Sequence, residues 1–382
     1  MMKYKNQIWN DLKVCVRYAC FHTTGATEYH AIIELEEEAG NTEMQYGWLE
    51  KAVQRLTKLP ELHGAVLVWK RFFASDTANQ KKYLQASAGE AVSIVQQPPL
   101  NRSKAAAWLY LVEGAQTVKQ PDDTVDTVVL QRPGYEHLYH TQLHDRSENA
   151  AGQTRHILEQ YAKRLAVKNA CIEKNCIRTW LFVQDVDVQY AGMVTARKDF
   201  FHQHELTEKT HYIASTGIEG RYIYPETLVS MDAYAIVGIQ QSQIRYLRAL
   251  SHLSPTCIYG VTFERGTAID YGDRRHIYIS GTASIDHHGA ILHPEDVEKQ
   301  TERVFENIQA LLSEATATMQ DVCHLIVYLR DSADYATVQQ YIDSRYPDIP
   351  RVMVWAPVCR QGWLIEIECM AICPIHTSYP VF

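Results

Sequence analysis

An arginine and a glutamate near the end of the chain have the types and spacing of an acid–base site. Arg351 begins a predicted strand, and Glu366 lies 15 residues later with apolar neighbours on both sides. An arginine guanidinium binds a carboxylate through two parallel hydrogen bonds. An apolar cleft raises the pKa of a glutamate toward the range useful to a general acid. If paired strands bring both side chains to one cleft, they form an anion clamp beside a proton donor. The alternative is a structural ion pair at a sheet edge.

The elements that must position these residues occur at least twice. Segments 153–165 and 300–312 each begin with Gln-Thr and place apolar residues on one face of a helix. After each helix come the same further elements in the same order: a β-rich run (177–183, 325–329), an aspartate (Asp185, Asp331), a helix (190–201, 335–346) and a late strand (228–235, 364–371). The matched order and spacing predict a repeated unit, and chance similarity of short helix–strand units is the alternative.

A weaker copy of the unit lies at the front of the chain. It has a helix at 48–59, a β-rich run at 66–73 and a late strand at 107–112. Three copies predict three α+β domains, each a mixed sheet backed by helices, at residues 1–118, 134–240 and 256–375. The predicted junctions are 114–133, which contains Lys119-Gln120-Pro121-Asp122-Asp123, and, less sharply, 240–255.

The third copy resembles the RidA (YjgF) family over about 110 residues. The resemblance lies in four motifs that occur in the family's order: Ile277–Ile285 with its Ser-Gly pair, Gln300-Thr301, Pro350-Arg351-Val352 and Ile365-Glu366-Ile367-Glu368. It implies a sheet backed by two helices and a barrel-like trimer with clefts between subunits. Three copies in one chain then imply an internal pseudotrimer.

The last 180 residues or so also resemble the chorismatases, which are larger members of the same superfamily. This likeness rests on Thr216-Gly217, Gln243–Tyr246, Tyr259–Gly266, Ser280–Ile285 and the position of Cys359 seven residues before Glu366. The chain departs from the chorismatases at Phe263-Glu264-Arg265-Gly266, where that group has Phe-Ser-Arg-Ala.

These resemblances imply roles for individual residues. Glu366 is the implied general acid and then base, Arg351 holds a substrate carboxylate, and Ser280 and Gly281 contact the substrate. A cysteine at position 359 implies the branch that forms 3-hydroxybenzoate, whereas an inert buried thiol is the alternative reading of Cys359.

A cleft between modules also needs further cations. Arg245, Arg265 and Arg197 are candidates, although an arginine of this kind is more often a solvated surface charge. Tyr246 is a candidate substrate hydrogen-bonding group or a core tyrosine. Ser230 in the second copy and Tyr110 in the first are expected to stand in the place of Glu366, so one complete site per chain is predicted.

The resemblance therefore predicts a chorismatase-like lyase or hydrolase that releases pyruvate from chorismate and gives 3-hydroxybenzoate. Protonation of the enol-ether group by Glu366 needs no metal and no organic cofactor. One alternative is a RidA-like deaminase acting on an imino or enamine acid. Another alternative, from a different class, is a non-catalytic protein that binds small metabolites in the same clefts.

Composition excludes several other classes. The formal net charge is −8, so the protein lacks the positive field that nucleic-acid binding uses. The sequence contains no run of 18 apolar residues, so no membrane span is predicted. Nine cysteines without a C-x-x-C pair favour a reduced, cytoplasmic protein without a zinc site. His140 and His144 have a metal-ligand spacing but lack the accompanying glutamate, so scattered histidines are favoured over a metal site. The expected partner is a small acidic metabolite, and the expected state is a monomeric pseudotrimer or a higher homo-oligomer.

Overall fold

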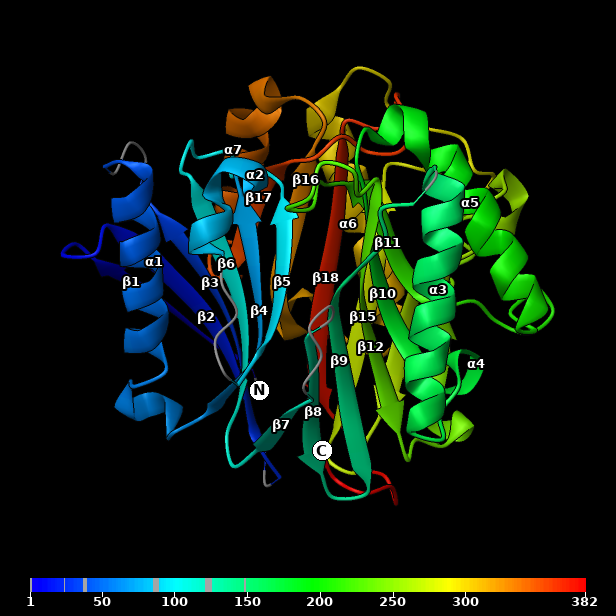
Figure 1. Cartoon of the computed structure of the whole chain (residues 1–382), viewed down its shortest axis with the longest axis horizontal. Coiled ribbons are helices and arrows are strands. Elements are labelled where there is room, and N and C mark those ends of the chain that lie inside the picture. Colours follow the sequence, from blue (N-terminus) through cyan, green and yellow to red (C-terminus); the bar gives the residue numbers. More distant parts are fainter. Residues whose placement is uncertain (1, 24, 37–39, 85–88, 121–125, 148) are drawn as a thin grey trace.

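Three mixed sheets face one another around a common axis, and the long helices cover their outer surfaces (Figure 1). The computed structural model describes residues 2–23, 25–36, 40–84, 89–120, 126–147 and 149–382. Within these residues each sheet has six strands. We call the sheets with their helices the first module (residues 3–112), the second module (116–237) and the third module (244–374).

The first module has the strand order β1-β2-β3-β6-β4-β5. Its elements are β1 (Lys3–Trp9), β2 (Val14–His22), β3 (Thr27–Leu35), α1 (Thr42–Leu56), β4 (Val66–Ala74), α2 (Thr77–Gln80), β5 (Ala91–Gln96) and β6 (Ala105–Val112). Only the pair β4 and β5 is parallel in this sheet as described.

The second module has the order β11-β10-β12-β9-β8-β7, and the third has β13-β14-β15-β18-β16-β17. The elements of the second are β7 (Gln116–Gln120), β8 (Asp126–Arg132), β9 (Tyr135–His144), α3 (Ala150–Val167), α4 (Ile172–Asn175), β10 (Cys176–Val183), α5 (Val186–Gln203), β11 (Ala214–Glu219) and β12 (Val229–Val237). Those of the third are β13 (Ile244–Leu247), β14 (Gly266–Asp270), β15 (Arg274–Ala283), α6 (Val297–Glu314), β16 (Val322–Leu329), α7 (Tyr335–Arg345), β17 (Arg351–Trp355) and β18 (Ile365–Pro374).

A glutamine near the start of the main helix marks the repeat in all three modules. The side-chain carbonyl of Gln153 accepts a hydrogen bond from the Leu228 backbone N–H at 2.8 Å, and that of Gln300 accepts one from Leu364 at 2.9 Å. Gln45 accepts one from the Lys104 backbone N–H at 2.7 Å. Each bond satisfies a backbone amide and ties the helix to the segment before the late strand. The predicted Gln-Thr signal of two copies therefore has a structural cause, and Gln45 extends it to the first.

Both predicted junctions contain strands in addition to the connections between the modules. Segment 114–133 contains β7 and β8, and segment 240–255 contains β13. Strand β7 is the outer strand of its sheet and is half exposed, so its polar side chains gave it the appearance of a loop. Residues 121–125 of the first predicted junction lie outside the described residues.

Two arginines and two carboxylates occupy the centre of the molecule, where the three sheets meet. Arg71 of β4 lies 3.1 Å from Asp232 of β12 and 3.8 Å from Glu368 of β18. Arg178 of β10 lies 2.7 Å from the Glu368 carboxylate. All four side chains are buried, so their opposite charges must balance for the core to be stable. We call these four residues the axis cluster.

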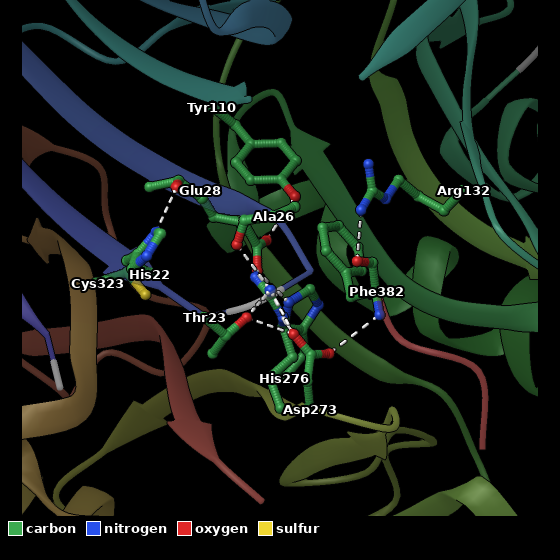
Figure 2. A network of polar contacts seen from close by, with 12 residues as sticks. His22, Thr23, Ala26, Glu28, Tyr110, Arg132, Asp273, His276, Cys323 and Phe382 are labelled. Atoms are coloured by element: carbon green, nitrogen blue, oxygen red, sulfur yellow. Dashed lines mark hydrogen bonds and ion pairs between the residues drawn. The ribbon is translucent and has the colours of Figure 1, made fainter. Parts of the chain in front are cut away.

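A second buried network joins the first and third modules (Figure 2). Glu28 of β3 is fully buried and accepts hydrogen bonds from Arg274 at 2.6 Å and from the Tyr110 hydroxyl at 2.6 Å; the His276 ring nitrogen lies 2.8 Å away. These partners hold the pKa of Glu28 well below its ordinary value despite burial, with His276 the largest favourable contribution. The network fixes how the two modules pack.

None of the described helices is long and apolar enough to cross a membrane.

Candidate active site

A pocket lies between the second and third modules and contains Glu366. It encloses about 510 Å³ of space not filled by atoms, including solvent at its mouth, a size within the usual range for small-molecule sites. The second module contributes Tyr190 and Arg197 from α5 and Ser215 and Gly217 from β11. The third module contributes the remaining lining residues: Val261, Phe263, Arg265, Gly281, Ala283, Ile285, Cys359, Arg360, Trp363 and Glu366.

Glu366 is buried and adjoins several cations. The residue is 6% exposed. Burial, reinforced by the neighbouring Glu368 carboxylate and opposed by Arg178 and Arg265, raises the pKa of Glu366 to about 8. The group is therefore protonated at neutral pH and can donate a proton to a bound molecule.

Gly281 lies directly beneath the Glu366 carboxyl group. β15 and β18 are neighbouring antiparallel strands, with Ala283 opposite Glu366, and the register shifts between Ile279 and Thr282. A methyl group at position 281 would overlap the Glu366 carboxyl oxygen. The absence of a side chain at Gly281 therefore makes the space in which the acid lies.

Three arginines line the pocket around Glu366: Arg197, Arg265 and Arg360. The Arg197 Nε donates to the Thr262 hydroxyl at 3.2 Å, and Arg265 donates from Nε and Nη2 to the Ser254 carbonyl at 3.3 and 3.0 Å. The Arg360 guanidinium stacks over the Trp363 ring, 4.9 Å from its centroid. Held in this way, the arginines give the pocket a positive lining that suits an anion.

Cys359 lies in the same pocket and interacts with Tyr190 of the other module. A side-chain hydrogen bond joins the Tyr190 hydroxyl and the Cys359 thiol. Burial, together with the charge of Glu366, raises the pKa of the Cys359 thiol to about 12. Cys359 is thus a neutral thiol at physiological pH, which excludes a standing thiolate nucleophile in this structure.

Arg351 does not lie beside Glu366, so the predicted clamp within one module was wrong. Strand β16 lies between β17 and β18, so Arg351 of β17 and Glu366 of β18 are two strands apart. Arg351 pairs with Leu325 of β16 and Glu366 pairs with Tyr328, three residues further along β16. The Arg351 side chain forms an ion pair with Asp343 of α7. It faces the first module, since β17 is bridged to Pro99 and Arg17 of the first module lies nearby. Burial, together with the charge of Arg17, lowers the pKa of Arg351 to about 10.

The strand register explains the misplacement. Each module has a short parallel edge strand (β5, β11, β17) that faces the next module, and Ser215 of β11 occupies the position in the second module that Arg351 occupies in the third. Ser215 lines the pocket with Glu366. An acid and its clamp at these positions therefore come from different modules, and in this chain the clamp position facing Glu366 is a serine.

Three other predicted residues also lie outside the pocket lining. Arg245 and Tyr246 are on β13, separated from β15 by β14, and Tyr246 stacks on His211 with 4.2 Å between ring centroids. The Ser280 hydroxyl is fully buried behind the pocket, donates to the Glu264 carbonyl at 2.6 Å and accepts from the Ser215 backbone N–H at 2.9 Å. Ser280 therefore joins the two modules. Gly281, Cys359, Arg265 and Arg197 are brought together with Glu366 as expected.

The equivalents of Glu366 in the other modules carry no carboxylate. Phe182 of β10 and Tyr328 of β16 each lie four residues after the register shift of their strand, and they pair with Ser230 and Glu366 respectively. Ser230 is therefore the equivalent of Glu366 in the second module, as predicted. In the first module the same position is Ala106, opposite Phe73, and the prediction of Tyr110 was wrong. This position follows from the strand register of β4 and β6, which a sequence comparison does not reveal.

Sequence reasoning missed Tyr190 and Arg360 as pocket residues. Tyr190 and Arg197 are seven residues apart on α5, so a helical periodicity puts them on one face two turns apart. That spacing was a usable signal once Arg197 was a candidate. Arg360 follows Cys359 directly in the sequence, but no motif or periodicity in the sequence singles it out as a pocket residue. In the described part of the chain, no group of three or more histidines, cysteines or acidic residues is arranged to hold a metal ion.

Comparisons with known proteins agree with this architecture. The family described as endoribonuclease L-PSP matches residues 267–373. A RutC family protein of Pyrococcus abyssi is 34% identical over 97 residues, which make up 25% of this chain and 76% of that protein. The 3-aminoacrylate deaminase RutC of Acinetobacter baylyi is 32% identical over 97 residues, 25% of this chain and 77% of that protein.

A crystal structure of a chorismatase resembles nearly the whole chain. The TM-score is 0.66 at 16% identity, and the match covers 92% of this chain and 100% of the chorismatase. At this identity the likeness establishes the fold, with three sheet-and-helix modules in one polypeptide. The chain therefore belongs to the endoribonuclease L-PSP family, that of the RutC and RidA proteins, and carries three modules of this fold as an internal pseudotrimer.

Proposed function

We propose that the pocket between the second and third modules binds chorismate and that Glu366 starts its cleavage to pyruvate. The observation that carries the proposal is a buried glutamate, with a pKa that burial raises to about 8, in a pocket lined by three arginines. Such a site holds an anion and delivers a proton to it. The whole-chain likeness to a chorismatase fold supports the proposal.

Chorismate fits these groups chemically. It carries a ring carboxylate and an enolpyruvyl ether with a second carboxylate, and Arg197, Arg265 and Arg360 are the proposed partners of these anions. Glu366 donates its proton to the terminal methylene carbon of the enol ether, which leaves an oxocarbenium ion stabilised by the ether oxygen. Water or the ring hydroxyl of the substrate attacks the oxocarbenium carbon, the one bonded to the ether oxygen, and Glu366 then recovers a proton as pyruvate leaves.

Two product branches follow from the nucleophile. Attack by water gives a dihydrodiol and pyruvate, with one water consumed. Attack by the ring hydroxyl, followed by aromatisation, gives 3-hydroxybenzoate and pyruvate with no net water. We propose the second branch, because Cys359 stands where the resembling enzymes of that branch carry a cysteine and because its thiol is neutral and adjoins the acid.

A RidA-like deaminase is the second candidate, favoured by the relative named 3-aminoacrylate deaminase. In that reaction a cation holds the substrate carboxylate while Glu366 activates water for attack on the imine carbon. The serine at position 215 weighs against it, since the clamp position that faces Glu366 has lost its arginine. A binding protein without turnover is the third candidate.

One assay separates the candidates. Purified protein is incubated with chorismate, and pyruvate and aromatic products are quantified for the wild type and for Glu366→Gln. We expect pyruvate and 3-hydroxybenzoate in equal amounts from the wild type, and pyruvate release at least about 100-fold slower from the variant. Pyruvate at the same rate from both proteins rejects the proposal. Turnover of a freshly generated imino acid instead would support the deaminase, and binding of chorismate without turnover would support the third candidate.

A further inference from the structure

The floor of the pocket is connected to the axis cluster by Thr216 of β11. The Thr216 hydroxyl oxygen accepts a hydrogen bond from the Gly281 backbone N–H at 3.0 Å and is hydrogen-bonded to the Glu368 carboxylate. Glu368 is also held by Arg178 at 2.7 Å and by the Trp180 indole N–H at 2.9 Å. Thr216 and Glu368 are both buried. A continuous chain of hydrogen bonds therefore runs from the centre of the molecule to the glycine beneath Glu366.

These hydrogen bonds determine where the Glu366 carboxyl group can lie. Gly281 is close enough to Glu366 that an added methyl group would overlap the carboxyl oxygen. Any shift of the Gly281 backbone therefore displaces the acid. The bond from Gly281 to Thr216 comes from the neighbouring module, so it also fixes the distance between the two walls of the pocket.

Glu368 acts on Glu366 by charge as well. Glu366 and Glu368 are two residues apart on β18, so their side chains point to the same face of the sheet, about 7 Å apart. The side chain of the residue between them points to the opposite face. Arg178 and the Trp180 indole bind the Glu368 carboxylate in the core. A fixed negative charge at this distance disfavours a second one on Glu366.

We propose that Thr216 and Glu368 are positioning residues of the site: Thr216 fixes the Gly281 backbone under the Glu366 carboxyl group, and the Glu368 carboxylate opposes ionisation of Glu366. The kinetic part of this inference rests on the proposed function. The part that concerns the protonation of Glu366 does not.

Other groups also face Glu366, and the test must hold them constant. They come from β10, α5, β16, the segment before β14 and the loop before β18: Arg178, Arg197, Tyr190, Tyr328, Arg265, Cys359 and Arg360. Of the charged groups acting on Glu366, Glu368 is the one that raises the pKa, and Arg178 and Arg265 lower it. Removal of the Glu368 charge therefore lowers the pKa of Glu366.

The direct test is a titration of Glu366 without substrate. Infrared difference spectra follow the protonated carboxyl band, assigned to Glu366 by its absence in Glu366→Gln. In Glu368→Gln we expect the midpoint to fall by about one pH unit or more. Asp232→Asn is the matched control, because Asp232 is the equivalent buried carboxylate of the second module and pairs with Arg71. It should shift the midpoint less. Equal midpoints in wild type and Glu368→Gln overturn the proposal.

A second pair of variants keeps the proposal testable if Glu368→Gln fails to fold. Thr216→Val removes the acceptor for the Gly281 N–H, whereas Thr216→Ser retains it. We expect Thr216→Val to lower kcat for pyruvate release by about 10-fold or more, with a smaller change in KM, and Thr216→Ser to restore most of the rate. Equal rates for the two variants overturn the positioning role. If neither wild type nor variants release pyruvate, the proposed function fails, and the infrared midpoint still decides the role of Glu368.

Discussion

Replacement of Glu366 by glutamine should stabilise the protein at alkaline pH. The native structure raises the pKa of Glu366 from its ordinary value of 4.5 to about 8. Below pH 4.5 the carboxyl group is protonated in the native and unfolded states alike. Between pH 4.5 and 8 the unfolded chain releases this proton while the native protein keeps it, so the free energy of unfolding falls as the pH rises. Above pH 8 the loss is complete.

The size of the effect follows from that pKa difference. A change from 4.5 to about 8 corresponds to about 5 kcal/mol of native-state destabilisation at high pH, which is an upper bound because the native pocket can admit water. Glutamine has the same shape and stays neutral at every pH. The stability of Glu366→Gln relative to the wild type should therefore grow from near zero at pH 4.5 to several kcal/mol at pH 9.

Urea unfolding at a series of pH values measures this difference. The exposed glutamate Glu302 offers a control, since Glu302→Gln changes the same chemical group where no pocket surrounds it. We expect a difference that rises through pH 5 to 8 for Glu366→Gln and a flat difference for Glu302→Gln. A flat difference for Glu366→Gln, or a wild type that gains stability relative to the variant over this range, would refute the account of the buried acid.

Three further variants test other parts of the structure. Gly281→Ala should displace the Glu366 carboxyl group and lower pyruvate release by about 100-fold, measured against an unchanged circular dichroism spectrum. Arg351→Ala should lower the free energy of unfolding by about 1–3 kcal/mol through loss of the bond to Asp343, and calorimetry that shows an unchanged melting temperature would contradict its structural role. Arg71→Met should cost about 3–5 kcal/mol, because it leaves the axis cluster with one excess negative charge, and denaturant midpoints measure the loss.

The repeated fold was predictable because its signals are local. Gln153 and Gln300 each open an amphipathic helix and bind the segment before the late strand, so the same residue type recurs where the same backbone amide needs an acceptor. The buried strands β10 and β16 are mostly apolar, so they can be recognised without knowledge of a distant partner. Strand β7 lacks such a run and was missed.

The site was only partly predictable because it is assembled across modules. Glu366 and Cys359 lie in one module and near each other in sequence, whereas Arg197 and Ser215 come from another. Sequence spacing within one copy therefore suggested the pair of Arg351 and Glu366, although each faces a different neighbour. The strand register, with its shifts in β4, β10 and β16, decides which residues are equivalent, and no sequence pattern encodes it.

The axis cluster shows what fusion of three modules permits. The position of Arg71 in the first module is taken by Trp180 in the second and Ile326 in the third. Three identical subunits would place three arginines together at this point. One chain can combine Arg71 and Arg178 with Asp232 and Glu368, so that the buried charges cancel.

The central claim is that Glu366, in the pocket between the second and third modules, cleaves chorismate without help from Arg351. The most direct measurement is the rate of pyruvate release from chorismate by Glu366→Gln and by Arg351→Ala under the same conditions. We predict that Glu366→Gln loses the activity and that folded Arg351→Ala keeps kcat/KM close to the wild-type value. Retained activity in Glu366→Gln, or a loss in Arg351→Ala as large as that in Glu366→Gln, would contradict it.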